Sequence, residues 1–278
     1  MARPAFRQAR PREQRRHPGP LPVSASSWDA TQYLRFEDER LRPALDLMGR
    51  IAHPSPKRVV DLGCGAGNAM PALAARFPGA TVTGVDGSAA MLAKAAGGGF
   101  ATEQADIANW SPAAPVDVLF SNAALHWLGG HEALFPRLLA HLAPGGVLAV
   151  QMPAMHDRPL RADQDRVARQ GPWAAKLAGV ASAPPILDPG AYYDLLRPRV
   201  AALEFWITEY VHVLRGEDPV VQWAMGSSLR PFLDALEGEL REGFLAAYRA
   251  AMRAAYPPQA DGVVLLPFRR LFMLARVA

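Results

Sequence analysis

The sequence predicts an α/β fold, a Rossmann-like, doubly wound sheet of seven mostly parallel strands with a helical cap. From residue 57 to residue 151, short apolar stretches typical of strands alternate with stretches typical of helices. Strands that are apolar along their whole length indicate a parallel sheet covered by helices on both faces. A glycine-rich segment, residues 61–68, follows the first of these strands. Open α/β sheets bind nucleotides at such a turn.

Composition narrows the class of protein. The 278 residues are 50% apolar and 20% charged, which excludes a disordered chain, a coiled coil and a collagen. The chain contains no run of eighteen apolar residues that would span a membrane. With Cys64 as the only cysteine, an intramolecular disulfide framework and a thiolate zinc cluster are excluded. No spacing typical of metal ligands is present, so we expect no metal.

The charge is concentrated at the amino terminus. Six arginines and one glutamate before Leu21 give this segment +5, which leaves −1 for the rest of a chain whose formal charge is +4. A nearly neutral body lacks the basic surface of a nucleic-acid-binding protein. Residues 1–23 are rich in Arg and Pro and are predicted to be a disordered tail. This tail lacks the serines of a transit peptide and the apolar core of a secretory signal, so we expect a cytoplasmic protein.

The predicted elements of the first half follow from apolar runs and breakers. Ser88 is a suitable N-cap, and Pro78-Gly79 and Pro144-Gly145-Gly146 are breakers. The predicted strands are 57–62, 80–85, 100–104, 116–121 and 147–151, and the predicted helices are 66–77, 88–96 and 131–141.

The second half has a different pattern. Residues 153–198 are rich in proline and mixed polar side chains, with no clear strand. Two long strands are predicted over 201–214 and 263–275, with helical periodicity between them from 217 to 256. We therefore expect one domain over 24–278, with cap elements at about 28–50, 153–198 and 216–260.

The glycine-rich segment favours one class of cofactor. Its sequence places Asn68 where the dinucleotide fingerprint has its third glycine, and it lacks the Gly-Lys-Ser/Thr of a phosphate-binding loop. Asp61 is an unfavourable neighbour for a pyrophosphate and a favourable one for an ammonium group. S-adenosylmethionine carries an ammonium and a sulfonium and has no phosphate. The alternative for the segment alone is a tight turn between a strand and a helix.

Acidic residues also follow the next two strands. Asp86 ends the second strand, where a carboxylate accepts hydrogen bonds from both ribose hydroxyls in dinucleotide folds. Asp106 follows the third strand and is placed to accept from an adenine amino group while Ile107 packs on the ring. Met91 either covers the adenine or packs in the core. These residues support S-adenosylmethionine as the cofactor.

Residues 61–68 with Val85-Asp86, Asp106 and Pro144-Gly145-Gly146 resemble the class I S-adenosylmethionine-dependent methyltransferases. A closer resemblance, to the trans-aconitate 2-methyltransferase family, covers almost the whole chain after the tail. The segments that carry this resemblance are 28–36, 121–128, 149–153, 191–194, 229–231 and 270–272. The tail has no counterpart in that family, and the segment after Pro153 matches it poorly.

This resemblance implies the esterification of a carboxylate on a small polycarboxylic acid, with trans-aconitate as the expected acceptor. A carboxylate is ionised at pH 7, so the reaction needs no acid or base catalyst. The residues expected to bind the cofactor are Asp61, Gly63, Gly65, Asn68, Asp86, Gly87, Ser88, Met91, Asp106, Ile107, Asn122 and Trp127.

Binding a polycarboxylate requires arginines, whose planar guanidinium groups match carboxylates. Arg270 lies within an apolar strand, where it needs a partner or a ligand unless it faces the surface. His126 either hydrogen-bonds the acceptor or is structural, and one of the adjacent tyrosines 192 and 193 is expected in the core. The residues expected to bind the substrate are Tyr33, Arg40, His126, Tyr192, Tyr193, Arg230 and Arg270.

Two other functions remain open at this point. One is the methylation of a different acid, such as a malonyl thioester on a carrier protein, although the neutral body offers no basic surface for an acidic carrier. The other is a non-catalytic module that binds the cofactor. The acidic residues and glycines of the predicted cofactor site argue against the second. The sequence gives no indication of the oligomeric state.

Overall fold

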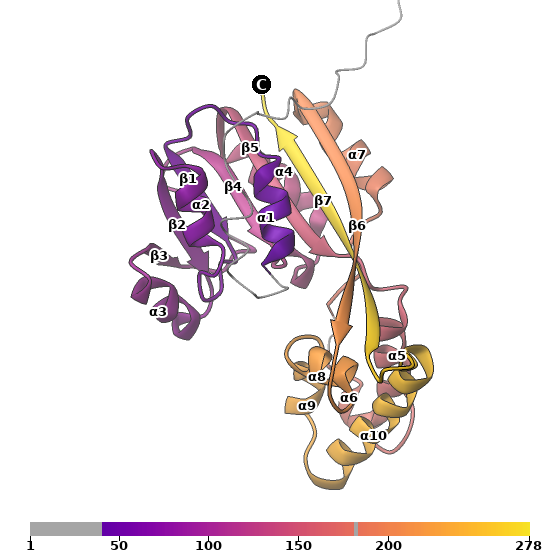
Figure 1. The fold of residues 1–278 in the computed structure, drawn as a ribbon. Helices are drawn as coiled ribbons and strands as arrows, with labels where there is room; N and C mark the ends of the chain where they lie inside the picture. Colours follow the sequence, from indigo (N-terminus) through magenta and orange to yellow (C-terminus); the bar gives the residue numbers. More distant parts are fainter. Residues whose placement is uncertain (1–40, 181–182) are drawn as a thin grey trace, which may run out of the picture.

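The computed structural model describes residues 41–180 and 183–278. The predicted tail, residues 28–40 of the predicted cap, Tyr33 and Arg40 lie outside the described residues. The described chain forms a seven-stranded sheet, with helices on both faces and a helical cap beyond one end (Figure 1). The predicted fold class is confirmed.

The strand order explains why the sheet is mostly parallel. Neighbours follow the order β3-β2-β1-β4-β5-β7-β6. The first five strands pair in parallel, and β7 is antiparallel to both of its neighbours. The strands are β1 (Arg58–Leu62), β2 (Thr81–Asp86), β3 (Ala101–Gln104), β4 (Val116–Asn122), β5 (Leu142–Pro153), β6 (Ala202–Leu214) and β7 (Val264–Arg276).

The register aligns the carboxyl ends of the central strands. Leu62 of β1 pairs with Val85 of β2, and Asn122 of β4 pairs with Gln151 of β5. Residues that follow β1, β2 and β4 therefore meet along one edge of the sheet, which is where open α/β sheets bind ligands.

Helices cover both faces and complete two apolar cores. One face carries α1 (Arg42–Gly49), α2 (Met70–Arg76) and α3 (Ala89–Gly97). The other face carries α4 (His131–Ala140) and α7 (Pro189–Leu196), with the 3₁₀ turns η2 (Leu125–Trp127) and η3 (Arg197–Arg199). The helix predicted from residue 66 begins later, because the glycine-rich loop continues to residue 69. The Ser88 hydroxyl accepts a hydrogen bond from the Met91 amide, which confirms it as the N-cap of α3.

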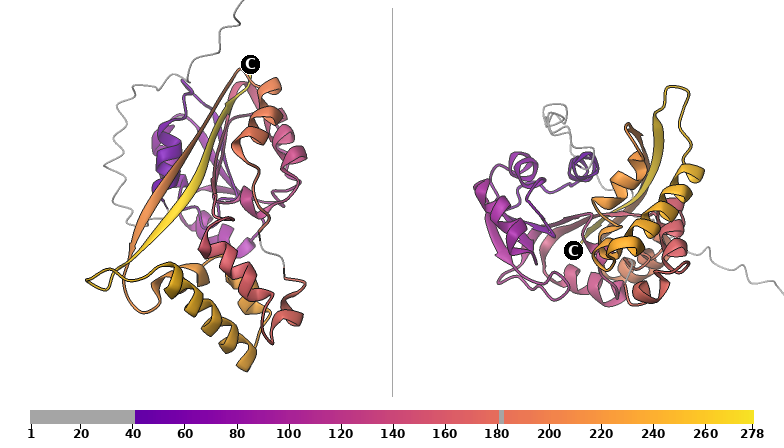
Figure 2. Two further views of the ribbon diagram at one scale, coloured as in Figure 1. Left: turned by 90° about the vertical axis from the view of Figure 1, so that its right-hand side faces the viewer. Right: turned by 90° about the horizontal axis from the view of Figure 1, so that it is seen from below.

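The cap has an apolar core of its own, in which Trp173, Phe244 and Tyr248 are buried. The strands β6 and β7 run beyond the rest of the sheet into this cluster (Figures 1 and 2). The cap helices are α5 (Pro159–Ala168), α6 (Ala174–Leu177), α8 (Pro219–Met225), α9 (Arg230–Asp234) and α10 (Gly238–Ala255).

One part of the predicted cap belongs to the body. Residues 189–199 form α7 and η3, and α7 packs against α4 and β6. The reason is that Tyr192 and Leu196, one turn apart on α7, are both buried in the core of the sheet. Within the described residues, no helix combines the length and the apolar character needed to cross a membrane.

Candidate active site

Two cavities lie at the carboxyl ends of the strands. The first, here called the loop cavity, has a volume of about 250 Å³ and is lined by the glycine-rich loop, Asp61 and Asn122. The second, the cap cavity, has a volume of about 230 Å³ and lies between the sheet and the cap. Asn122 lines both. Its Oδ1 is buried and makes no hydrogen bond with the described residues.

The glycine-rich loop is held tightly at Gly63. Its φ of +80° lies in the region that favours glycine, and its amide donates to the Val85 carbonyl at 2.7 Å. A Cβ atom at this position would lie 2.2 Å from the Cβ of Ala124 at the start of η2. Only glycine therefore allows the loop to pass this close to the segment that follows β4.

Asp61 places a carboxylate at the floor of the loop cavity. The residue is 2% exposed, and burial, followed by the nearby charge of Asp86, raises the pKa of its carboxyl to about 7. A bound ammonium group would favour the ionised form. Asp61 is thus a buried acid beside Gly63, a position that has no room for a side chain. This combination fits the amino acid end of S-adenosylmethionine, which carries an ammonium group.

Asp86 and Asp106 lie where the sequence predicts them, and both also organise the backbone. Asp86 accepts hydrogen bonds from the amides of Gly65 and Ser88, both at 2.9 Å. Asp106 accepts from the Ala108 amide and the Asn109 side chain, both at 2.9 Å. A carboxylate has about four lone-pair sites, so each acid retains acceptor capacity for a ligand.

The other predicted cofactor residues lie in different parts of the site. Met91 is 39% exposed, so the alternative that it packs in the core is wrong. Ile107 is partly buried against the apolar core. Gly65 and Asn68 line the loop cavity, whereas Trp127 lines the cap cavity. Gly87 and Ser88 connect β2 to α3.

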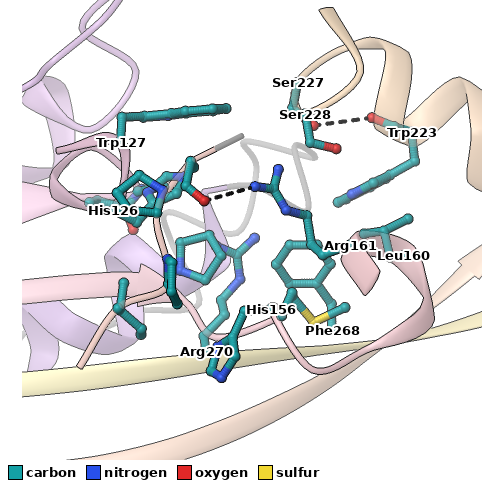
Figure 3. A pocket seen from close by; sticks show the side chains of 18 residues that line it. His126, Trp127, His156, Leu160, Arg161, Trp223, Ser227, Ser228, Phe268 and Arg270 are labelled. Atoms are coloured by element: carbon teal, nitrogen blue, oxygen red, sulfur yellow. Dashed lines mark hydrogen bonds between the residues drawn. The ribbon is translucent and has the colours of Figure 1, made fainter. Parts of the chain in front are cut away.

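The cap cavity brings together side chains from distant segments. Figure 3 shows His126 and Trp127 on one side, Arg161, Trp223 and Ser228 on the opposite side, and Arg270 between them. The first two follow β4, the next three come from the cap, and Arg270 comes from β7. None of the described residues that line this cavity is acidic. The arrangement therefore favours an anionic ligand.

Arg270 lies in the interior of the molecule. It is 4% exposed, its Nη1 donates to Gln151 Oε1 at 3.3 Å, and its guanidinium lies 4.6 Å from the centre of the Phe268 ring. The alternative of a surface-facing strand position is wrong. Its neighbours fix the orientation of the guanidinium at the cavity wall.

His126 is electrostatically coupled to both arginines of the cavity. Burial lowers its pKa to about 3, and the charges of Arg161 and Arg270 contribute to this shift. The imidazole is therefore neutral at pH 7. Its Nδ1 is buried and makes no hydrogen bond with the described residues.

Three predicted substrate residues lie away from the cap cavity. Tyr192 is buried in the core, where its hydroxyl lies 2.5 Å from His131 Nδ1, so it is a structural residue. Tyr193, on the outer side of α7, is exposed. Arg230 has a side chain that is 75% exposed and pairs with Asp234 at 3.8 Å, because α9 instead buries Phe232. These three assignments to the acceptor site are corrected.

Most residues of the cap cavity were not assigned to the site from the sequence, among them the polar or aromatic side chains of Arg161, Trp223 and Ser228. Arg161 lies in the polar segment after Pro153, where nothing distinguishes it from Arg158, Arg166 and Arg169. The sequence gives only a weak indication that Ser228 is buried, namely its position next to the apolar Leu229. Ser228 is buried, and its hydroxyl makes no hydrogen bond with the described residues.

Comparisons with known proteins agree with this geometry. A family model described as a methyltransferase domain matches residues 33–184. The trans-aconitate 2-methyltransferase of Methylobacterium nodulans is 50% identical over 90% of this chain and 98% of its own length. That of an Azoarcus species is 48% identical over the same shares of the two chains.

Solved structures share the fold at low sequence identity. The YcgJ protein of Bacillus subtilis matches with a TM-score of 0.56 and 13% identity over 84% of this chain and 97% of its own. Phosphoethanolamine N-methyltransferase 2 of Haemonchus contortus, solved with S-adenosylhomocysteine, has a TM-score of 0.51 and 16% identity. That match covers 85% of this chain and about half, 52%, of the other. With this fold and these relatives, the chain belongs to the trans-aconitate 2-methyltransferase family of class I methyltransferases.

Proposed function

We propose that this protein transfers the methyl group of S-adenosylmethionine to a carboxylate of trans-aconitate. One observation carries the proposal: an acidic cavity and a cationic cavity meet at Asn122. A donor with an ammonium group suits the first cavity, and an acceptor with several carboxylates suits the second. Relatives at about 50% identity bear the name of this activity.

Asp61 of the loop cavity would share the cofactor with residues that follow β2 and β3. Asp61 would accept from the ammonium group, and Asp86 would accept from the ribose hydroxyls. Asp106 and Ile107 would hold the adenine. When bound, the cofactor supplies a methyl group made electrophilic by its sulfonium. Asn122 is the only residue of the described lining that the two cavities share, so it would hold the sulfonium end of the cofactor next to the acceptor.

The acceptor carboxylate needs no activation by the protein. It is already ionised at pH 7, so a carboxylate oxygen forms the new bond to carbon, the electron pair of the breaking bond goes to sulfur, and no proton moves. His126, with a pKa near 3, is too weak a base to contribute and acts by hydrogen bonding. Positioning the acceptor and excluding water then account for catalysis, on the order of 7–11 kcal/mol.

The test is methyl transfer from labelled S-adenosylmethionine to three candidate acceptors. These are trans-aconitate, the monocarboxylate crotonate and a malonyl thioester on a carrier protein. We expect an ester of trans-aconitate and little product from the other two. Transfer to the carrier alone would establish the alternative acceptor, and cofactor binding without transfer to any acid would contradict the proposal.

A further inference from the structure

We propose that Arg161 of the cap binds a second, non-reacting carboxylate of the acceptor and thereby selects tricarboxylic over dicarboxylic acids. The inference rests on the proposed function, because it concerns the acceptor of the same reaction. Arg270 from the sheet and Arg161 from the cap would each hold one carboxylate. The third carboxylate would then lie at Asn122 and His126, next to the loop cavity.

The position of Arg161 supports this role. It lines the cap cavity, and Figure 3 shows its side chain extending into the cavity from the cap while Arg270 enters from β7. Its Nη2 donates to the Ala183 carbonyl at 3.3 Å, which leaves several of its five N–H donors for a ligand. Its charge contributes to the lowered pKa of His126, so the two groups lie close enough to act on one bound molecule.

The electrostatics of the cavity favour two carboxylates over one. Burial lowers the pKa of the Arg161 guanidinium, which means that its charge is partly removed from water. The lining brings two arginines and no described acidic side chain to the cavity, and the charge of Asp165, one helical turn further along α5, counteracts part of the shift at Arg161. A tricarboxylic acceptor has two carboxylates besides the reacting one, so it compensates the charges of both arginines. A dicarboxylic acceptor has only one besides the reacting one, so one guanidinium stays desolvated and without an acceptor carboxylate.

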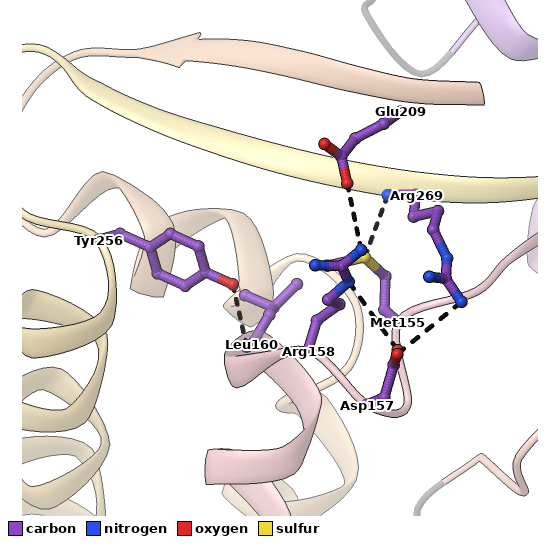
Figure 4. A network of polar contacts seen from close by, with 7 residues as sticks. All are labelled: Met155, Asp157, Arg158, Leu160, Glu209, Tyr256 and Arg269. Atoms are coloured by element: carbon purple, nitrogen blue, oxygen red, sulfur yellow. Dashed lines mark hydrogen bonds and ion pairs between the residues drawn. The ribbon is translucent and has the colours of Figure 1, made fainter.

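The start of α5 is held firmly, so Arg161 is positioned before a ligand binds. The Leu160 amide donates to the Tyr256 hydroxyl at 3.2 Å, and the Leu160 carbonyl accepts from the Tyr248 hydroxyl at 2.9 Å. Arg158 pairs with Glu209 of β6 at 3.5 Å, as Figure 4 shows. These contacts tie the residues around Arg161 to α10 and to the sheet. Little conformational entropy is then lost when Arg161 binds a carboxylate.

The arrangement also determines which carboxylate reacts. A carboxylate bound by both prongs of a guanidinium has its lone pairs engaged and is a poorer nucleophile. The carboxylate near Asn122 meets an amide and a neutral imidazole instead. It therefore retains the free lone pair that attacks the methyl group.

The test compares trans-aconitate with fumarate, which lacks its carboxymethyl group and so has one carboxylate fewer. In Arg161→Gln we expect kcat/KM for trans-aconitate to fall by about 30- to 300-fold and that for fumarate by less than about 3-fold. Arg270→Gln should reduce both. Arg166→Gln is the matched control, because Arg166 is an exposed residue of the same helix that pairs with Asp163 at 2.8 Å. The control should leave both values unchanged.

Direct binding separates this proposal from the proposed function. Calorimetry with trans-aconitate and S-adenosylhomocysteine should show the same selective loss in Arg161→Gln, even if the wild type transfers no methyl group. If the wild type binds trans-aconitate but transfers no methyl group, the proposed function is overturned and the role of Arg161 in binding is not. A wild type that neither binds nor methylates trans-aconitate would overturn both.

An equal loss on trans-aconitate and fumarate would overturn the role of Arg161 and leave the function intact. Should Arg161→Gln fail to fold, Arg161→Lys keeps the charge but lacks the planar fork. We expect this variant to show a smaller loss, still confined to trans-aconitate. Loss on both acids in Arg161→Lys would also contradict the proposal.

Discussion

The loop cavity and the cap cavity lie side by side but are built in opposite ways. The loop cavity takes most of its lining from residues 61–69, around the single turn between β1 and α2, together with Leu41 and Asn122. The cap cavity takes residues from β4, α5, α8 and β7, which span positions 122–270. The first depends on local turns and the second on how distant segments pack. Changes at the loop cavity should therefore affect the donor alone, and changes at the cap cavity the acceptor alone.

The largest effect is expected from Gly63→Ala. The new Cβ would meet the Ala124 Cβ at 2.2 Å, so the loop must move away from η2. We expect a loss of about 2–4 kcal/mol in stability and of more than roughly 100-fold in cofactor affinity, measured by thermal unfolding and calorimetry. Gly99→Ala is the control. Gly99 has a similar φ of +84°, but a Cβ added there would meet no atom within 4 Å, so this change isolates the backbone strain. Equal effects of the two changes would contradict a tightly held loop.

The next effect concerns Asp86→Ala. Removing charge-assisted hydrogen bonds to the ribose should weaken cofactor binding by about 2–3 kcal/mol, which is roughly 30- to 150-fold. Asp117 provides the comparison, because its carboxylate also accepts from two backbone amides, of Lys57 and Arg58, but at the opposite edge of the sheet. Asp117→Ala should lower the melting temperature without changing the cofactor dissociation constant. Near wild-type affinity in Asp86→Ala would remove this residue from the site.

A smaller effect should appear in the pH dependence of cofactor affinity. The Asp61 pKa is raised from 3.8 to about 7, so its ionisation destabilises the free protein as the pH rises from about 4 to 7. A bound ammonium group favours the ionised form. Cofactor affinity should therefore fall by roughly 5-fold from pH 7 to pH 6, with proton release on binding. Calorimetry in two buffers of different ionisation enthalpy measures that release. Asp61→Asn should bind weakly and without this pH dependence, and a flat wild-type profile would contradict the mechanism.

The smallest effect is expected at Arg230, which the sequence analysis assigned to the acceptor site. Its exposed ion pair with Asp234 should contribute less than about 1 kcal/mol to stability. Arg230→Gln should keep kcat/KM for trans-aconitate within roughly 2-fold of wild type. Steady-state kinetics beside Arg270→Gln gives a direct comparison of an exposed and a buried arginine. Similar losses in both variants would show that Arg230 reaches the acceptor after all.

The elements were predictable to within a few residues where a local signal existed. Ser88 was identified as an N-cap because capping depends on its own side chain and the next turn. The start of α2 was placed too early, although Gly67, whose φ is +82°, and Asn68 are residue types typical of a loop. One of the two adjacent tyrosines was expected in the core, and Tyr192 is buried there, but the sequence does not indicate which of the two faces the core.

The sequence by itself determined the parallel sheet, the order of the glycine-rich loop and its acids, and the family. These features depend on alternating apolar runs and on turns a few residues long. Only the tertiary structure decided which arginines line the cap cavity. Arg161, Arg230 and Arg270 are alike as residue types, and their roles depend on whether α5, α9 and β7 turn them toward the cavity or toward water. That orientation is set by contacts such as those of Tyr248 and Tyr256 with Leu160, between residues almost one hundred positions apart.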